Sequence, residues 1–268
     1  MAVLIVMSLP GVIAQRENKF KMKESKRLLL TATAAVGAFV FIASTSFGSP
    51  STAQQTDEGD RAENAASVLR EIMEAPDVAI PEDLLSRAYG IAVIPHVVKG
   101  AFGFGGRYGK GLIAQRNADG GWGTPLFVQI SGGSFGFQIG VEATDVIMVF
   151  TNSEGIEPLL RGQLKIGADA SATAGPVGRK AEVGTDILLN SAIYSYSRAK
   201  GLFAGVALDG AVLQLDDDAN ESVYGETSVA ADLATARVGG TAAGVVGSFL
   251  RALDTYAPLG TSDAARGQ

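Results

Sequence analysis

Two stretches of this chain alternate apolar side chains with glycine. In residues 101–108 two phenylalanines alternate with two glycines, and residues 134–141 set Phe135, Phe137, Ile139 and Val141 against glycines. Alternation with period two is typical of a β-strand, whose successive side chains point to opposite faces. Each stretch therefore predicts a strand with one apolar face and one bare face. A bare face lets another backbone, a helix or a ligand come close, and close packing is the favoured cause.

Other segments extend this prediction to the body of the chain. Short apolar runs bounded by turn residues predict strands at residues 90–95, 112–116, 126–131, 146–151, 193–197 and 202–213. Helical spacing and flanking prolines predict helices at residues 61–75, 81–89, 156–164 and 242–256. The predicted fold class is α+β, a mainly antiparallel glycine-rich sheet with N-terminal helices and a C-terminal helix packed on it. The C-terminal helix has a membrane surface as its alternative site, and residues 54–59 are predicted to be a polar linker.

The N-terminal segment has the layout of a targeting signal. A basic stretch, residues 19–27, precedes the 16 uncharged residues 28–43, and small residues follow to Ala53. This order is typical of a secretory signal peptide, with cleavage expected after Ala53. An uncleaved anchor is the alternative, because residues 28–47 are long enough to cross a bilayer. Met22 is the better start for such a signal.

Charge and composition exclude several classes of protein. The net charge is −6, but residues 1–53 carry +4 and the remainder −10. An acidic body does not favour binding to nucleic acid through phosphate contacts. The absence of cysteine excludes disulfides, thiolate metal sites and a catalytic thiol.

Catalytic and cofactor motifs are missing as well. His96 is the only histidine, so a histidine-based metal site or a Ser-His-Asp triad has little support. The glycine runs near Lys110 lack the spacing of a phosphate-binding loop. The acidic residues 216–221 lack the glycine and glutamate of a calcium loop, and a solvated turn or helix start is favoured. We therefore predict no enzyme activity, no cofactor and no metal, and a hydrolase would need carboxylates that converge in space.

Basic residues near glycine turns are the remaining candidates for binding. The turn Gly175–Gly178 has the composition of a backbone anion site, and Arg179 and Lys180 follow it. Further cations flank glycine-rich strand ends: Lys99, Arg107, Lys110, Arg198 and Lys200. The predicted lipid-headgroup contacts are Arg107, Lys110, Arg179, Lys180, Arg198 and Lys200. The alternative is that these are solvated loop charges.

Several motifs occur in the order typical of one family. They are Ile80-Pro81 with Leu84-Leu85, Gly90–Pro95, Lys99-Gly100, Gly105-Gly106, Gly109–Gly111, Gly121-Trp122, Gly133–Gly140, Gly167–Ala170, Gly175–Arg179, Tyr194–Gly205, and Asn220 with Tyr224-Gly225. Over residues 60–225 the chain thereby resembles the SYLF domain family, as an exported, bacterial-type member. The domains predicted are a signal or anchor at 1–53, a SYLF-like domain at 54–225 and an Ala/Gly-rich, partly helical segment at 226–268.

The resemblance implies lipid binding and no enzyme activity. Eukaryotic relatives bind phosphoinositide membranes, some bind actin filaments, and their membrane contact is linked to an amphipathic N-terminal helix, which residues 61–75 match in position. The function predicted is an exported, membrane-associated module for an anionic, phosphoinositide-like phospholipid headgroup in the periplasm or outside the cell. An exported protein would not meet actin. The alternative is a structural or protein-interaction domain of the cell envelope without a lipid ligand.

Overall fold

The computed structural model describes residues 51–75, 79–102, 104–135, 140–178, 191–199, 201–226 and 229–259. Residues 50–268 form one compact unit. The predictions for the targeting segment and for Met22 lie outside the described residues. No helix among the described residues has both the length and the apolar character needed to cross a membrane.

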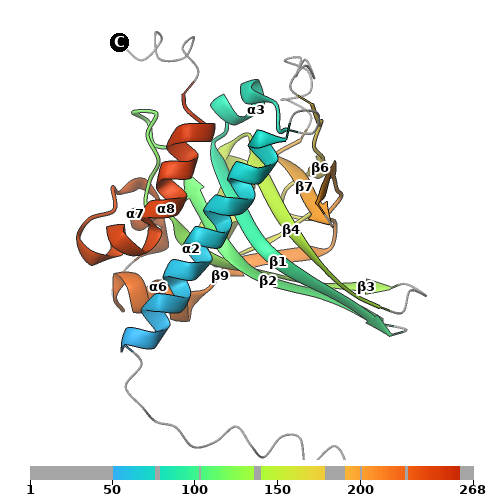
Figure 1. The fold of residues 1–268 in the computed structure, drawn as a ribbon, viewed down its shortest axis with the longest axis horizontal. Helices are drawn as coiled ribbons and strands as arrows, with labels where there is room; N and C mark the ends of the chain where they lie inside the picture. Colours follow the sequence, from blue (N-terminus) through green and yellow to red (C-terminus); the bar gives the residue numbers. More distant parts are fainter. Residues whose placement is uncertain are drawn as a thin grey trace, which may run out of the picture. The chain divides into compact units, whose positions relative to one another are not determined.

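The strands within these ranges form one curled sheet (Figure 1). They are β1 (Gly90–Phe102), β2 (Phe104–Gln115), β3 (Leu126–Phe135), β4 (Gly140–Phe150), β5 (Gln163–Lys165), β6 (Ala172–Ala174), β7 (Ile193–Ala199), β8 (Leu202–Gly205) and β9 (Ala211–Leu215). The order across the sheet is β5-β9-β3-β2-β1-β4-β7-β6, with β8 paired to β7. All pairs are antiparallel except β6 with β7. The predicted α+β class with a mainly antiparallel sheet is confirmed.

The helices precede, interrupt and follow the sheet. They are α2 (Ser51–Glu74), α3 (Glu82–Ser86), α4 (Ser153–Leu160), α6 (Asp217–Tyr224), α7 (Ala230–Thr235) and α8 (Gly240–Tyr256). Helix α2 crosses one face of the sheet with α8 beside it (Figure 1). The predicted packing of the C-terminal helix is therefore confirmed, because Val246, Phe249 and Leu253 are buried.

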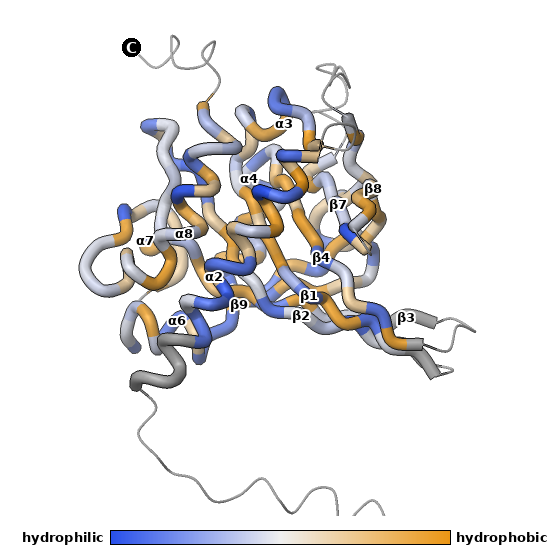
Figure 2. The backbone as a smooth tube through the Cα atoms, in the orientation of Figure 1, coloured by the Kyte–Doolittle hydropathy of each residue, from blue (hydrophilic) through white to orange (hydrophobic). Residues whose placement is uncertain are grey.

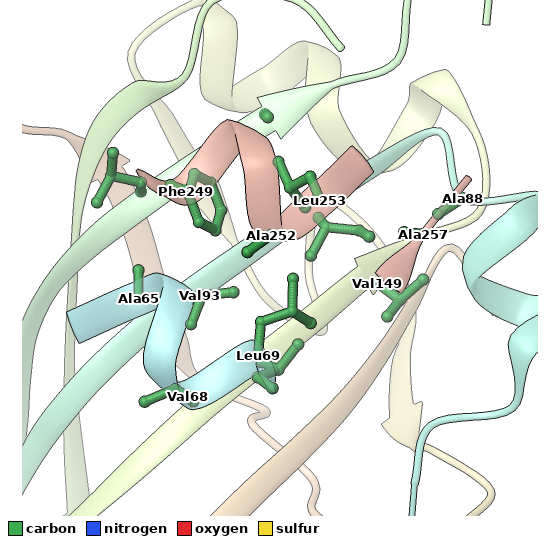
Figure 3. Close-up of a cluster of buried hydrophobic side chains, with 14 of the residues drawn as sticks. Ala65, Val68, Leu69, Ala88, Val93, Val149, Phe249, Ala252, Leu253 and Ala257 are labelled. Atoms are coloured by element: carbon green, nitrogen blue, oxygen red, sulfur yellow. The ribbon is translucent and has the colours of Figure 1, made fainter. Parts of the chain in front are cut away.

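The sheet separates two hydrophobic cores. On the helix face, Leu69 of α2 and Phe249 and Leu253 of α8 pack over Val93 and Val149 (Figure 3). On the opposite, concave face, side chains of the alternate strand positions pack against α4 and β5; these include Ile94, Ile113, Val128, Met148, Ile156 and Leu164. Figure 2 shows hydrophobic residues along the strands where the helices cover them. Both cores lie within residues 50–268.

A β-bulge separates the covered part of β1 from a projecting part. The pairing of β1 with its neighbours shifts between Val93 and Val98, and His96 has a φ of 51°. The His96 backbone N–H donates to Asp145 Oδ1 at 2.9 Å, which fixes this bend. Beyond it, the ends of β1, β2, β3 and β4 run out past α2 (Figure 1). We call the described residues 97–102, 104–109, 131–135 and 140–144 of these strands the ribbon.

The structure corrects several predicted boundaries. Residues 101–108 and 134–141 were each predicted as one strand, but each stretch contains the end of one strand and the start of the next. Residues 202–213 likewise divide into two strands, and the helix predicted at 156–164 begins at Ser153 and ends at Leu160. The predicted linker 54–59 is helical, because α2 begins at Ser51. Helix α7 was not predicted.

Candidate functional site

The concave face of the ribbon contains a cleft of about 230 Å³. Its floor is aliphatic and comes from β1, β3, β4 and the segment after β8: Val97, Ile130, Val146, Val206 and Leu208. Its charged lining consists of Lys99, Arg107 and Glu142. The cleft is smaller than a pocket that encloses a whole drug-sized molecule. Its size therefore suits one polar group with a short apolar neighbour.

The charged residues of this cleft lie in one cross-strand row. Strand register places Lys99 opposite both Glu142 and Arg107, and Arg107 opposite Gly132. Like charges directly opposite one another destabilise a sheet. No ion pair joins Lys99 or Arg107 to an acid of the described chain. The row therefore carries two cations and one carboxylate, a net positive charge in an acidic domain.

A glycine makes room for the Arg107 side chain. A Cβ at Gly132 would lie 3.4 Å from Arg107 Cγ and 3.1 Å from the Ala211 Cα. Because positions 107 and 132 face the same side of the sheet and glycine has no side chain, the arginine stem crosses β3 closely. Arg107 remains only half-buried, so its guanidinium is accessible at the cleft.

Lys110 lies on the other face of the sheet, in an ion cluster. Its Nζ lies 2.9 Å from Asp216 Oδ2, and Arg61 Nη1 lies 2.8 Å from the same oxygen. Arg61 also lies 3.0 Å from Glu58 in the same helix. Through Asp216, the cluster links α2 to β2 and to the start of α6. Burial favours a raised pKa for Asp216, but the hydrogen bonds from Lys110 and Arg61 outweigh it and hold this pKa below its usual value. Burial is the largest effect on Glu58 and raises the pKa of its carboxyl.

Arg198 is also held by carboxylates on the helix face. Its Nε lies 2.6 Å from Asp145 Oδ2, and its Nη1 forms an ion pair with Glu71 of α2. The guanidinium carbon lies 5.5 Å from the centre of the Phe203 ring, and the side chain is only 19% exposed. Lys110 and Arg198 thus contribute to the internal structure. Their predicted role in binding a headgroup stays a prediction.

The glycine turn at 175–178 packs against Tyr196. A Cβ at Gly175 would collide with the Tyr196 ring, whose hydroxyl donates to the Pro176 carbonyl at 3.1 Å. The N–H of Gly175 donates to the Ser195 carbonyl, and the N–H of Gly178 donates to the Ala79 carbonyl. Two of the N–H groups proposed for an anion site are therefore already bound. Arg179, Lys180 and Lys200, three of the six predicted contacts, lie outside the described residues.

A larger cavity of about 820 Å³ lies between α3, the turn after β2 and α7. Its arginines are already paired: Arg87 with Asp83 at 3.0 Å and Arg237 with Asp119 at 2.6 Å. Arg116 donates to four backbone carbonyls and stacks on Trp122 at 4.1 Å. This cavity thus offers less free positive charge than the smaller cleft on the ribbon.

Prediction from sequence reached only part of this site. Arg107 was among the predicted contacts, whereas Lys99 was noted only for its place beside a glycine. The aliphatic floor and the pairing of Lys99 with Arg107 depend on strand register, which the sequence did not specify. No group of three metal-ligating side chains occurs among the described residues. The acidic segment 216–221 is the start of α6, as the favoured alternative predicted.

Comparisons with known proteins identify the domain. Residues 131–254 match the family model described as Ysc84, Las17-binding protein actin regulator. The match begins within β3 and ends within α8, so it includes the whole of β4 and the ribbon part of β3. The chain carries a domain of the Ysc84/SYLF family. The predicted resemblance is thereby confirmed for the family.

Similar full-length proteins place this domain within longer chains. Protein YSC84 of Saccharomyces cerevisiae is 35% identical over 182 residues, which is 65% of this chain and 39% of the relative. LAS seventeen-binding protein 3 of the same yeast is 34% identical over 165 residues, 60% and 36% of the two chains. Human SH3 domain-containing YSC84-like protein 1 is 32% identical over 169 residues, 61% and 49%. The chain thus spans less than half the length of these curated relatives.

The family description also bears on catalysis. It is that of a binding protein and regulator, not of an enzyme. The prediction that this Ysc84/SYLF domain is a non-enzymatic binding module is therefore confirmed.

Proposed function

We propose that this Ysc84/SYLF domain is an exported, membrane-associated module that binds the phosphate of an anionic phospholipid headgroup at the ribbon cleft. The observation that carries the proposal is the pair Lys99 and Arg107, which lie side by side above an aliphatic floor and form no ion pair with Glu142, the one carboxylate among the described residues that line the cleft. A phosphate would neutralise this like-charged pair. The apolar floor would then contact the adjoining glycerol and upper acyl carbons of the same lipid.

Helix α2 is a poor alternative for membrane contact in this chain. Its apolar residues, among them Ala65, Leu69 and Ile72, are buried beneath α8 and over the sheet. Its outward face carries acids such as Glu63 and Glu74, which an anionic surface repels. The helix would have to leave the core before its apolar face could reach a membrane. The ribbon needs no such rearrangement.

Vesicle flotation tests the headgroup site. Residues 50–268 contain both cores and are mixed with phosphatidylcholine vesicles that lack or contain phosphatidylglycerol or a phosphoinositide. We expect binding only to the anionic vesicles. The double variant Lys99→Ala, Arg107→Ala is expected to bind about thirtyfold more weakly, because each cation near an anionic surface contributes about 1 kcal/mol. Inorganic phosphate as competitor distinguishes recognition of a free phosphate from recognition of a lipid.

A matched variant separates site-specific binding from net charge. Arg87→Ala, Arg237→Ala removes the same two charges from paired, exposed positions elsewhere. It is expected to bind nearly as well as the parent domain. Equal losses for both double variants, or binding that ignores anionic lipid, would overturn the proposal. Arg179→Ala, Lys180→Ala tests the predicted contacts outside the described residues in the same assay.

Export is the second component of the proposal, and it rests on the signal-like segment before Ala53. Mass analysis of the N-terminus of the native protein is expected to find a chain that begins near Gln54. An intact N-terminus in the membrane fraction would favour the anchor, and an intact N-terminus in the cytosol would contradict export. An exported domain would not meet actin.

The competing function is protein binding without lipid. It is favoured by the family description, which names a Las17-binding protein and an actin regulator. It predicts a specific protein partner that co-purifies from the envelope fraction and no response to lipid in flotation. The two functions are thus distinguished by the same vesicle assay.

A further inference from the structure

The helix-side face of the ribbon is apolar and uncovered. Val98 is 46% exposed, Tyr108 49% and Val141 81%. These are three of the six large hydrophobic residues with exposed side chains among the described residues. Strand register places Val98 beside both Tyr108 and Ala143, and places Val141 beside Gly100. The three side chains therefore belong to one continuous patch and are not scattered.

The glycines of this face are not explained by packing within the domain. A Cβ at Gly100 or at Gly133 would meet nothing within 4 Å. Gly111, on the opposite face of β2, differs, because a Cβ there would collide with the Val93 carbonyl. Glycine inside a strand weakens it unless another group approaches closely. The bare positions of the ribbon thus point to a surface that something outside the domain covers.

The distribution of charge on the two faces of the ribbon indicates which kind of partner covers the apolar face. The described helix-side positions of the ribbon carry no charged side chain; they are Val98, Gly100, Gly106, Tyr108, Ser131, Gly133, Val141 and Ala143. The opposite face of the same strands carries Lys99, Arg107 and Glu142, so its net charge is positive. A second copy of the chain stacked on the apolar face would leave these cations unmatched. An anionic bilayer matches both features, because its phosphates attract the cations and its hydrocarbon accepts the apolar patch.

We infer that the ribbon is a membrane wedge: its helix-side face, with Val98, Tyr108 and Val141, enters the upper acyl region of an anionic bilayer while Lys99 and Arg107 stay at the phosphates. This inference rests on the proposed function. Tyr108 suits the boundary, since tyrosine is enriched at membrane–water interfaces. Its hydroxyl donates to Gln129 at 3.1 Å, on the side of the ribbon nearer the helices.

A single fluorescent label tests the insertion directly. The chain has no cysteine, so Val141→Cys creates one attachment site for a polarity-sensitive dye. Leu202→Cys is the matched control, because Leu202 is 78% exposed but lies on β8. With vesicles of phosphatidylcholine and phosphatidylglycerol, the dye at position 141 is expected to shift to the blue and become shielded from iodide. The dye at position 202 is expected to change little.

Flotation of the same labelled samples separates the two claims. Domain that floats while the dye at position 141 stays in water overturns the wedge and leaves the headgroup proposal standing. Domain that does not float overturns both. A blue shift without vesicles that grows with protein concentration would assign the face to a second copy of the chain and also overturn the wedge.

A charge substitution provides an independent measurement. Val141→Asp is expected to weaken vesicle binding about tenfold, because a carboxylate would replace the apolar side chain that contacts the acyl region of the bilayer. Leu202→Asp makes the same chemical change at a similarly exposed position and is expected to have a small effect. Equal effects of the two substitutions would show that added charge alone weakens binding, and would overturn the wedge.

Discussion

At the scale of single residues, Asn220 extends the sheet with its side chain. Its Oδ1 accepts from the Phe127 N–H at 2.9 Å, and its Nδ2 donates to the Phe127 carbonyl at 2.8 Å and to the Asp216 carbonyl at 3.0 Å. The amide thus satisfies backbone groups where β3 leaves the ladder with β9. It also fixes α6 against the strand. The adjacent Tyr224 hydroxyl donates to the Pro125 carbonyl in the same region.

Asn220→Asp should therefore destabilise the domain although it hardly changes shape. The carboxylate keeps the acceptor for Phe127 but loses both donors and faces two carbonyl oxygens. We expect the free energy of unfolding to fall by about 2–3 kcal/mol, measured by urea denaturation. Asn64→Asp on the exposed face of α2 is the control and is expected to change it little. Equal effects of the two substitutions would contradict this role for Asn220.

Residue types were easier to predict than residue partners. The cations beside glycine turns stand out in the sequence, but the acids that bind Lys110 and Arg198 are far along the chain. Asp216 is more than a hundred residues from Lys110, and Glu71 and Asp145 reach Arg198 from α2 and β4. Only the fold brings these charges together. A charge count therefore could not separate Lys99 and Arg107 from the cations that stabilise the structure.

At the scale of elements, Arg116 joins segments that have no strand pairing with one another. Its guanidinium donates to the carbonyls of Leu85 in the last turn of α3, of Ala88 after α3, of Gly120 in the turn after β2, and of Ala257 after α8. A cation that binds carbonyls at helix C-termini also interacts favourably with the helix dipoles. Burial lowers the pKa of Arg116 to about 10, so the side chain stays charged at neutral pH.

Arg116→Met should loosen the ends of α3 and α8. The methionine can fill part of the space but removes the arginine donor from all four carbonyls. We expect a loss of about 3 kcal/mol in the free energy of unfolding and faster amide hydrogen exchange after α8. Arg237→Met removes an exposed arginine from the same region and is expected to change stability little. Slow exchange after α8 in the Arg116 variant would contradict the role.

Element types were predicted better than element ends. Period-two alternation identified the strands, but it continues through the glycines at residues 103 and 136, so each stretch was predicted as one strand instead of parts of two. The helix at 51–74 was predicted to start late because its first residues are polar, and polar residues also occur in linkers. No sequence pattern indicated the bulge at Pro95-His96. The bulge depends on the positive φ of His96, which residues other than glycine rarely adopt.

At the scale of the whole molecule, carboxyl groups determine how the free energy of unfolding depends on pH. The two carboxyls of the ion cluster, Glu58 and Asp216, contribute with opposite signs. The pKa of Glu58 is raised above its usual 4.5, so between these two pKa values the folded state binds more protons than the unfolded chain, and stability rises as pH falls through this range. The pKa of Asp216 is held below its usual 3.8, so its stabilising effect is present above that value and is lost as pH falls through the lower pKa.

The urea concentration at the midpoint of unfolding should therefore increase as the pH is lowered from neutral to mildly acidic values, and should decrease below about pH 4. Protonation of other carboxylates in the domain of net charge −10 adds to the rise by relieving repulsion. Glu58→Gln should make the rise smaller without moving the fall, whereas Asp216→Asn should lower the midpoint at neutral pH and weaken the acid-dependent fall. A Glu58→Gln profile parallel to that of the parent would show that repulsion across the whole domain, and not the buried carboxyl, produces the rise.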